Sequence, residues 1–242
     1  MIADYTHTEL LIAVIARLLE GCRHVVTGAA SPIPGAGALL ARARSGANLR
    51  VNILGSTRHN TFTNGGVELF DLAGQGRIDA FFLGGGQIDG QANINLVGTG
   101  EYPELDVRWP GSFGSSYMYF LVPRVILFRE EHSRRVMVPK VDFVSAPGLS
   151  PSNVYRPGGP YKLLTGRGLF GFDRDRGRFR LESIHPGETL EQILDNTGFE
   201  FDRDQRVPLT AAPDAAELQL LRSHVRDELA EAYPRFAATL FS

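Results

Sequence analysis

Two glycine-rich turns are the segments of this chain most suited to chemistry. Gly84, Gly85 and Gly86 follow the apolar run at 81–83 in the sequence FFLGGGQID, and a second turn, GSFG, occupies 111–114. Glycine has no Cβ, so it lets main-chain N–H groups approach a ligand closely and adopts positive φ without strain. Two such turns in one stretch indicate a backbone-lined pocket for an anionic oxygen, either a phosphate or a thioester oxyanion. The alternative is a pair of tight turns needed only for chain reversal.

Several separated segments, in the same order, resemble one family. They are DYTHTEL at 4–10, GGGQID at 84–89, EHSRR and KVDFVSAPG within 131–148, GGPYKLLT and GLFGFD within 158–173, and LDNTGFEFD at 194–202. Together they resemble the β subunit of family I coenzyme A transferases of the glutaconate type. The resemblance extends through most of the chain and is more specific than either glycine turn alone.

The resemblance implies an acyl-CoA pocket formed by both glycine turns. The residues implied to line the thioester region are Gly84, Gly85, Gly86 and Gln87, with Asn93 supporting the turn through side-chain hydrogen bonds to the backbone. The second rim is implied to be Gly111, Ser112, Phe113 and Gly114. Phe113 stands where the family has a glycine. Its ring therefore either enters the acyl pocket and makes it more apolar, or turns away from it.

The family also implies a catalytic glutamate, which this chain lacks. That carboxylate attacks the thioester and forms a glutamyl-CoA intermediate, which divides CoA transfer into two easier steps. The corresponding position falls on Leu54, or on Gly55 if the alignment shifts by one residue. Neither has a carboxylate, and Glu68 and Asp71 lie further along in an expected helix. The catalytic residue is therefore unknown from the sequence.

Other side chains offer weaker candidates for chemistry. Ser56 and His59 follow the same expected strand, but residues this close in sequence seldom face each other, so a local turn role is favoured. The remaining histidines show no helix-face spacing with an acid, and we expect no metal site. The single cysteine, Cys22, excludes an intrachain disulfide. The arginines in REEHSRR at 129–135 could bind CoA phosphates, although a solvated turn neutralised by its own glutamates is favoured.

Length, composition and charge bound the class of protein. With 242 residues, 43% of them hydrophobic, the chain is long enough for one large α/β domain, and we expect a single domain over 1–242. Lys and Arg total 25 and Asp and Glu total 27, a balance that does not favour nucleic-acid binding. The apolar stretch at 10–19 contains Arg17 and is too short to span a membrane. No signal-peptide pattern is visible, and a cytoplasmic location is expected.

Short segments of alternating type predict the fold class. We expect helices at 6–20, 38–44, 67–73 and 190–194 and after Pro213, and strands at 24–30, 49–54, 79–83, 93–98, 122–128 and 141–144. A loop is expected at 31–37. Thr6 and Glu9 have capping-box spacing, and Asp214 is a plausible cap. Runs such as FFL and VILF are apolar throughout, as is typical of strands covered on both faces. The prediction is an α/β fold with a layered, open, mostly parallel sheet, similar to CoA transferases.

The resemblance implies a function and a partner. It implies a β subunit that works with a CoA-transferase-type α subunit, generally in a heterotetramer of two α and two β subunits. An acyl-CoA thioester is the implied substrate, with no tightly bound cofactor. The implied reaction is CoA transfer between carboxylic acids. Because the glutamate is missing, two alternatives stay open: a branch from bacterial steroid-ring degradation that hydrolyses a carbon–carbon bond of a cyclic acyl-CoA with a base on the α subunit, and a non-catalytic acyl-CoA-binding partner.

Overall fold

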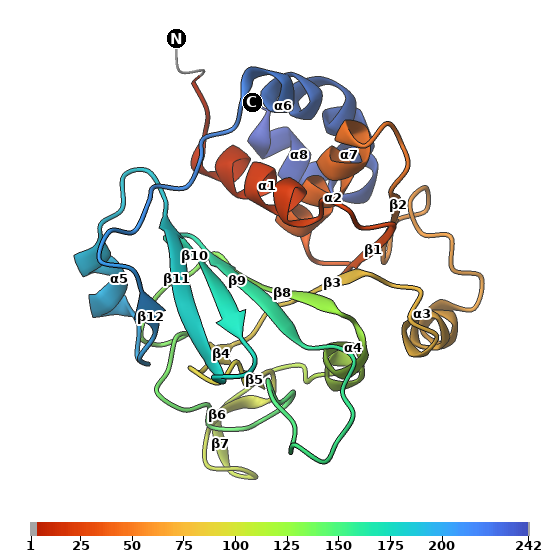
Figure 1. Cartoon of the computed structure of the whole chain (residues 1–242). Coiled ribbons are helices and arrows are strands. Elements are labelled where there is room, and N and C mark those ends of the chain that lie inside the picture. Colours follow the sequence, from red (N-terminus) through yellow and green to blue (C-terminus); the bar gives the residue numbers. More distant parts are fainter. Residues whose placement is uncertain (1–3, 242) are drawn as a thin grey trace. The chain divides into compact units, whose positions relative to one another are not determined.

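The computed structural model describes residues 4–241, which divide into two compact units (Figure 1). Unit 1 combines the chain up to Phe82 with the segment from Ala211 onward, and unit 2 comprises Leu83–Thr210. The single domain expected from the sequence stays a prediction.

Unit 1 is a short parallel sheet with helices. Strand β1 (His24–Thr27) pairs in parallel with both β2 (Arg50–Ile53) and β3 (Ala80–Leu83). The helices from the first part of the chain are α1 (His7–Leu18), α2 (Pro32–Arg44) and α3 (Gly65–Gly74). The last part of the chain adds α6 (Ala215–Leu220), a π-helical turn η1 (Leu221–Val225), α7 (Arg226–Ala232) and α8 (Pro234–Leu240). The strand residues of β1 and β3 are all buried, as the uninterrupted apolar run of β3 predicts for that strand.

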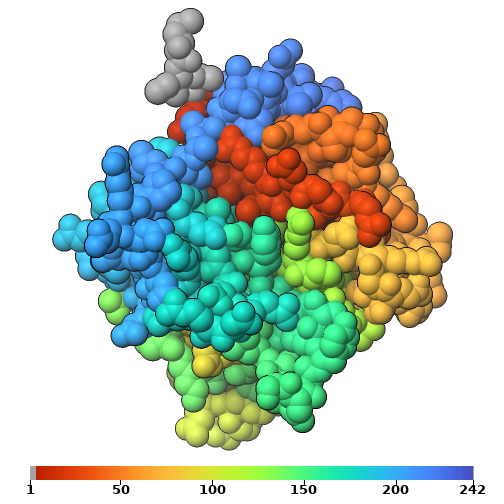
Figure 2. All heavy atoms as spheres, in the orientation of Figure 1, coloured from red at the N-terminus to blue at the C-terminus, as the bar shows by residue number. Residues whose placement is uncertain are grey.

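Ion pairs with buried glutamates join α1 to α6 and η1. The predicted capping box at the start of α1 is confirmed: the Thr6 side chain accepts from the Glu9 N–H, and the Glu9 carboxylate accepts from the Thr6 N–H. Glu9 also accepts from Arg222 at 2.6 Å, and Arg17 donates to Glu217 at 3.0 Å. Figure 2 shows the C-terminal atoms (blue) packed directly against those of α1 and α2 (red and orange). The C-terminal helices are therefore an integral part of unit 1.

The loop expected at 31–37 is wrong, because α2 already begins at Pro32. Proline is well suited to the first turn of a helix, where its missing N–H costs no hydrogen bond. Two glycines follow because other parts of unit 1 pack closely there. A Cβ on Gly37 would lie 2.3 Å from Ile15 Cγ2, and one on Gly35 would lie 2.6 Å from the Tyr233 ring. Tertiary packing thus overrides the low helix propensity of glycine.

Unit 2 is a mixed sheet with two small ribbons. Strand β8 (Arg124–Arg129) pairs in parallel with β9 (Pro160–Thr165), and β10 (Gly168–Asp173) pairs antiparallel with β9 and with β11 (Arg178–Ile184). Strand β12 (Asp202–Arg203) pairs in parallel with β11. The ribbons are β4 (Gln87–Ile88) with β5 (Ile94–Asn95), and β6 (Gly98–Gly100) with β7 (Leu105–Arg108). The helices are α4 (Ser115–Leu121) and α5 (Leu190–Asn196).

The predicted class, α/β with an open and mostly parallel sheet, is confirmed. Two strand predictions in unit 2 are wrong or too long. Residues 141–144 form no strand, and the segment 93–98 divides into Ile94–Asn95 of β5 and Gly98, where β6 begins. In both places the backbone bonds to neighbouring loops instead of to a sheet. Leu96 N, for example, donates to the Ser145 hydroxyl at 2.8 Å.

Candidate functional site

The first glycine turn is shaped by close packing. None of Gly84, Gly85 and Gly86 has a positive φ. A Cβ on Gly85 would lie 2.7 Å from the Gln87 carbonyl oxygen, and one on Gly86 would lie 2.2 Å from the Trp109 ring. The Gly86 N–H donates to the Asn95 carbonyl at 2.9 Å. Gly84 is exposed, whereas Gly85 is buried. Glycine is therefore needed at 85 and 86 because other parts of the turn and the indole occupy the space of a side chain.

Gln87 uses its side chain to hold this turn in place. Its carboxamide oxygen accepts from Asn95 Nδ2 at 2.8 Å and from the Asp142 N–H at 2.9 Å, and its Nε2 donates to Asp142 Oδ2 at 3.1 Å. Only 5% of Gln87 is exposed. The residue connects β4 to β5 and to the segment around residue 142.

Asn93 supports the next turn. Its N–H and its Nδ2 both donate to the Asp89 carboxylate at 3.0 Å. Its Oδ1 accepts from the Gly148 N–H at 3.1 Å. The backbone group that its side chain binds is thus that of Gly148, and its link to the glycine turn runs through Asp89 in the same ribbon.

The second turn begins α4. Gly111 has φ 103° and donates its N–H to the Leu96 carbonyl at 3.2 Å. Phe113 adopts φ 42°, uncommon for a residue with a side chain, and is 91% exposed. Ser112 accepts at its carbonyl from both the N–H and the hydroxyl of Ser115. Gly114 is the N-cap residue of α4.

The structure brings the two turns together through residues 95–97. Asn95 accepts from Gly86, Leu96 accepts from Gly111, and the carbonyl of Val97 accepts from Trp109 N–H at 2.9 Å. The indole of Trp109 then packs on the Cα face of Gly86. Trp109 is the residue of this region that sequence reasoning missed, although it lies only two positions before Gly111.

The end of β2 carries no carboxylate of its own. Leu54 is half-buried and donates its N–H to the Thr27 carbonyl at 3.0 Å, and Gly55 makes the turn with φ 88°. The Ser56 hydroxyl accepts from the backbone N–H of His59 at 2.8 Å, so the imidazole is not its partner in this bond. His59 is 5% exposed, and its Nε2 is buried without a hydrogen-bond partner among the described residues. Burial, followed by the charge of Arg42, lowers the pKa of His59.

An acid from a distant part of the chain reaches this turn. The Glu231 carboxylate, on α7, accepts from the Ser56 hydroxyl at 2.5 Å and from the N–H and hydroxyl of Thr57 at 2.9 and 2.7 Å. The Arg58 N–H adds a longer bond at 3.3 Å. These hydrogen bonds lower the pKa of Glu231 to about 2, and the bond from Ser56 contributes most. A carboxylate stabilised in this way is a weak base and a weak nucleophile.

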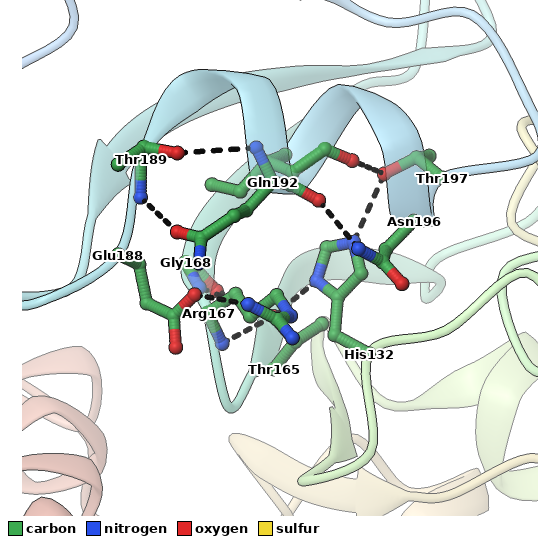
Figure 3. Close-up of polar contacts among 10 residues, drawn as sticks. His132, Thr165, Arg167, Gly168, Glu188, Thr189, Gln192, Asn196 and Thr197 are labelled. Carbon is green, nitrogen blue, oxygen red and sulfur yellow. Dashed lines mark hydrogen bonds and ion pairs between the residues drawn. The ribbon is translucent and has the colours of Figure 1, made fainter.

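Unit 2 also contains a buried histidine that is held on both sides (Figure 3). His132 Nδ1 lies 2.8 Å from the Thr165 hydroxyl, and Nε2 lies 2.9 Å from the Thr197 hydroxyl. Burial, with smaller contributions from the charges of Arg167 and His185, lowers the pKa of His132 to about 4. The imidazole is therefore neutral near pH 7 and connects β9 to α5.

The arginines of REEHSRR have protein partners. Arg129 and Arg135 form ion pairs with Glu131 at 3.3 and 2.6 Å, and Arg134 donates to the Asp195 carbonyl at 2.7 Å. Within residues 4–241 no cluster of three or more His, Cys, Asp or Glu side chains suits a metal ion. Across the same residues, no helix is both long enough and apolar enough to cross a membrane.

The chain belongs to the coenzyme A transferase family, whose model matches residues 7–196. It is 32% identical over 176 residues to the B subunit of the 3-oxoadipate CoA-transferase of Pseudomonas knackmussii, covering 70% of this chain and 67% of that one. It is 32% identical over 151 residues to the B subunit of the glutaconate CoA-transferase of Acidaminococcus fermentans, covering 60% of this chain and 56% of the relative. It is 26% identical over 236 residues to a cholesterol ring-cleaving hydrolase IpdB subunit of Rhodococcus jostii, covering 91% and 92%. The predicted family is confirmed, and the chain is the β subunit of a CoA-transferase family enzyme.

Solved structures of the family share this fold. The IpdAB structure from Rhodococcus jostii superposes with a TM-score of 0.81 at 26% identity, covering 91% of this chain and 94% of that one. The decarboxylase AibA/AibB superposes with a TM-score of 0.81 at 23% identity, covering 99% and 100%, which shows a common fold. One fold thus serves proteins named as transferases, hydrolases and decarboxylases, so the reaction has to be argued from the site.

Proposed function

We propose that this chain binds an acyl-CoA thioester at its two glycine turns and works with a CoA-transferase-type α subunit. The observation that carries the proposal is the joining of both turns on residues 95–97, which places the segments 84–87 and 111–114 around one short scaffold. The names of the relatives support the partner, since they are B subunits or components of AB pairs. A heterotetramer of two α and two β subunits is the proposed assembly.

The reaction that fits best does not pass through a thioester on this chain. Leu54 and Gly55 offer no carboxylate, and Glu231, whose carboxylate binds this turn in the described part of the chain, accepts hydrogen bonds from Ser56, Thr57 and Arg58. A pKa of about 2 makes Glu231 a poor attacking group. We therefore place the catalytic base on the α subunit. CoA transfer between carboxylic acids is the reaction that the family resemblance implies. In this complex it would need a nucleophile from the α subunit.

Carbon–carbon bond hydrolysis is the second candidate. It is favoured by the missing carboxylate at 54 and 55 and by the match over 92% of a ring-cleaving hydrolase subunit. In such a step a base takes a proton from water, and the resulting hydroxide adds to a ring carbonyl of the acyl-CoA. The bond to the neighbouring carbon then breaks, leaving a carboxylate on one side and a carbon that takes up a proton on the other. No oxidant or reductant is required.

The test is to co-express the chain with an α-type subunit encoded beside it and to assay the purified complex. Acyl-CoAs are screened for CoA transfer to added acids and for addition of water. Intact-mass spectrometry follows each incubation, with borohydride and hydroxylamine as traps for a glutamyl-CoA. We expect turnover with no adduct on this chain. CoA attached to any of its glutamates would refute the placing of the base on the partner, and binding without turnover of any acyl-CoA would show a non-catalytic partner.

A further inference from the structure

We propose that the indole of Trp109 is the wall of the acyl pocket and selects apolar, ring-bearing acyl groups over acyl groups with a second carboxylate. This inference rests on the proposed function, because it assumes that the thioester binds beside the first glycine turn. It adds the chemical class of the acyl group and names the side chain that recognises it.

The contact between Trp109 and the first glycine turn is direct. A Cβ on Gly86 would lie 2.2 Å from Cζ3, 2.3 Å from Cη2 and 2.6 Å from Cε3 of the indole. The benzo edge of the ring therefore covers the face of Gly86 where any other residue would carry its side chain. Trp109 as a whole is only partly buried, so part of the residue stays exposed beside the turn.

The backbone of Trp109 is held by the same scaffold that holds the turn. The backbone N–H of Trp109 donates to the Val97 carbonyl at 2.9 Å. The backbone N–H of Val97 donates to Asn95 Oδ1, also at 2.9 Å. Asn95 also accepts from Gly86 through its carbonyl and donates from Nδ2 to Gln87 at 2.8 Å. Trp109 and Gly86 are thus both tied to Asn95. An aromatic side chain beside a backbone turn is a feature that selects ligands by shape.

The chemistry of an indole face decides which acyl groups fit. Its π-system is negative on the face, so it stacks well on flat apolar rings and disfavours a nearby carboxylate. Phe113 follows four residues later, in the second glycine turn, and is 91% exposed. The wall therefore favours a cyclic acyl group, such as a benzoyl group, over a dicarboxylic one of similar size, such as a succinyl group.

The experiment measures binding of benzoyl-CoA, succinyl-CoA and free CoA to the complex with the α subunit. Trp109 is the single tryptophan of this chain. The difference in tryptophan fluorescence between the wild-type complex and the Trp109→Phe complex is therefore the emission of Trp109, free of the α subunit's contribution. We expect benzoyl-CoA to bind more tightly than succinyl-CoA and to quench this signal. Calorimetry should show that Trp109→Ala lowers the benzoyl-to-succinyl affinity ratio by roughly tenfold, with a smaller drop for Trp109→Phe and unchanged binding of free CoA.

Two further variants distinguish an effect of the Trp109–Gly86 contact from a general effect of removing an aromatic side chain. Gly86→Ala should displace the indole and lower the ratio in the same direction as Trp109→Ala, while Tyr155→Ala, which removes an 87%-exposed aromatic ring of the same unit, should leave it unchanged. Melting curves establish that each variant folds, and Trp109→Phe keeps the test decisive if Trp109→Ala does not. A wild-type preference for succinyl-CoA, or a ratio unaltered by either Trp109 variant, overturns the inference and leaves the proposed function standing. A wild-type complex that binds none of the three CoA compounds overturns the proposed function itself.

Discussion

Glu231→Gln should destabilise unit 1 by removing the charge that closes the turn after β2. The pKa of Glu231 falls from its ordinary value of 4.5 to about 2 because Ser56 and Thr57 donate hydrogen bonds to it. At about 1.4 kcal/mol for each tenfold change in acidity, this lowering corresponds to about 3 kcal/mol. Solvent screens a half-buried carboxylate, so we expect a loss of about 1–2 kcal/mol in the free energy of unfolding at pH 7. In the variant, the NH2 group of the glutamine would also face the donors of Ser56 and Thr57, and an NH2 group cannot accept a hydrogen bond.

The pH dependence of this loss has a defined sign. A lowered folded-state pKa means that the carboxylate stabilises the fold above the unfolded pKa of 4.5, and that the stabilisation disappears as pH falls through about 2. Chemical unfolding at pH 7 and at pH 3 therefore gives two values for each protein. The difference between wild type and Glu231→Gln should be largest at pH 7 and clearly smaller at pH 3.

A neighbouring acid on the same helix provides the control. Asp227 is exposed on α7, and Asp227→Asn removes the same charge from the helix. We expect its effect to stay within about 0.5 kcal/mol. If Glu231→Gln and Asp227→Asn unfold at the same denaturant concentration at pH 7, the carboxylate does not stabilise the turn and the reasoning above fails.

Three other substitutions test separate parts of the structure. Because the pKa of His132 is lowered from 6.5 to about 4, the free energy of unfolding should fall by up to about 3 kcal/mol between pH 6.5 and 4, and His132→Gln should flatten that slope in denaturant titrations. Tyr119→Phe removes a buried 2.8 Å bond to the Ala92 carbonyl and should cost about 1–2 kcal/mol by the same assay. Phe113→Gly suits a φ of 42°, so the melting temperature should hardly change while the range of accepted acyl-CoAs widens; an unchanged range in the folded variant would place the ring away from the substrate.

Local patterns predicted those elements whose stability is itself local. The capping box of Thr6 and Glu9 that opens α1, and Asp214 as the cap of α6, were readable because each cap and its partner lie three residues apart. The start of α2 was not readable, because Gly35 and Gly37 weaken a helix unless Tyr233 and Ile15 pack against them. Spacing alone contains no information about such distant neighbours.

In the candidate site, too, the local features could be predicted from the sequence and the contacts with distant residues could not. The glycine turns are written in consecutive residues, so their existence could be predicted, whereas the role of Gly86 depends on Trp109 and that of Gln87 on Asp142. Both partners lie in other loops. The family resemblance supplied the expectation of a pocket, but the reason for each glycine is visible only in the packing.

The contact between Glu231 and Ser56 joins residues 175 positions apart, and no motif indicates it. This contact bears on the catalytic residue that the family resemblance implies. An acid does reach the end of β2, where relatives are expected to hold a nucleophile, yet its hydrogen bonds to Ser56 and Thr57 use it to fix the backbone. A carboxylate that is ionised near pH 7 and binds this turn is suited to positioning the backbone, not to attacking a thioester. This use of Glu231 is the reason why we propose that the α subunit supplies the base of the acyl-CoA reaction.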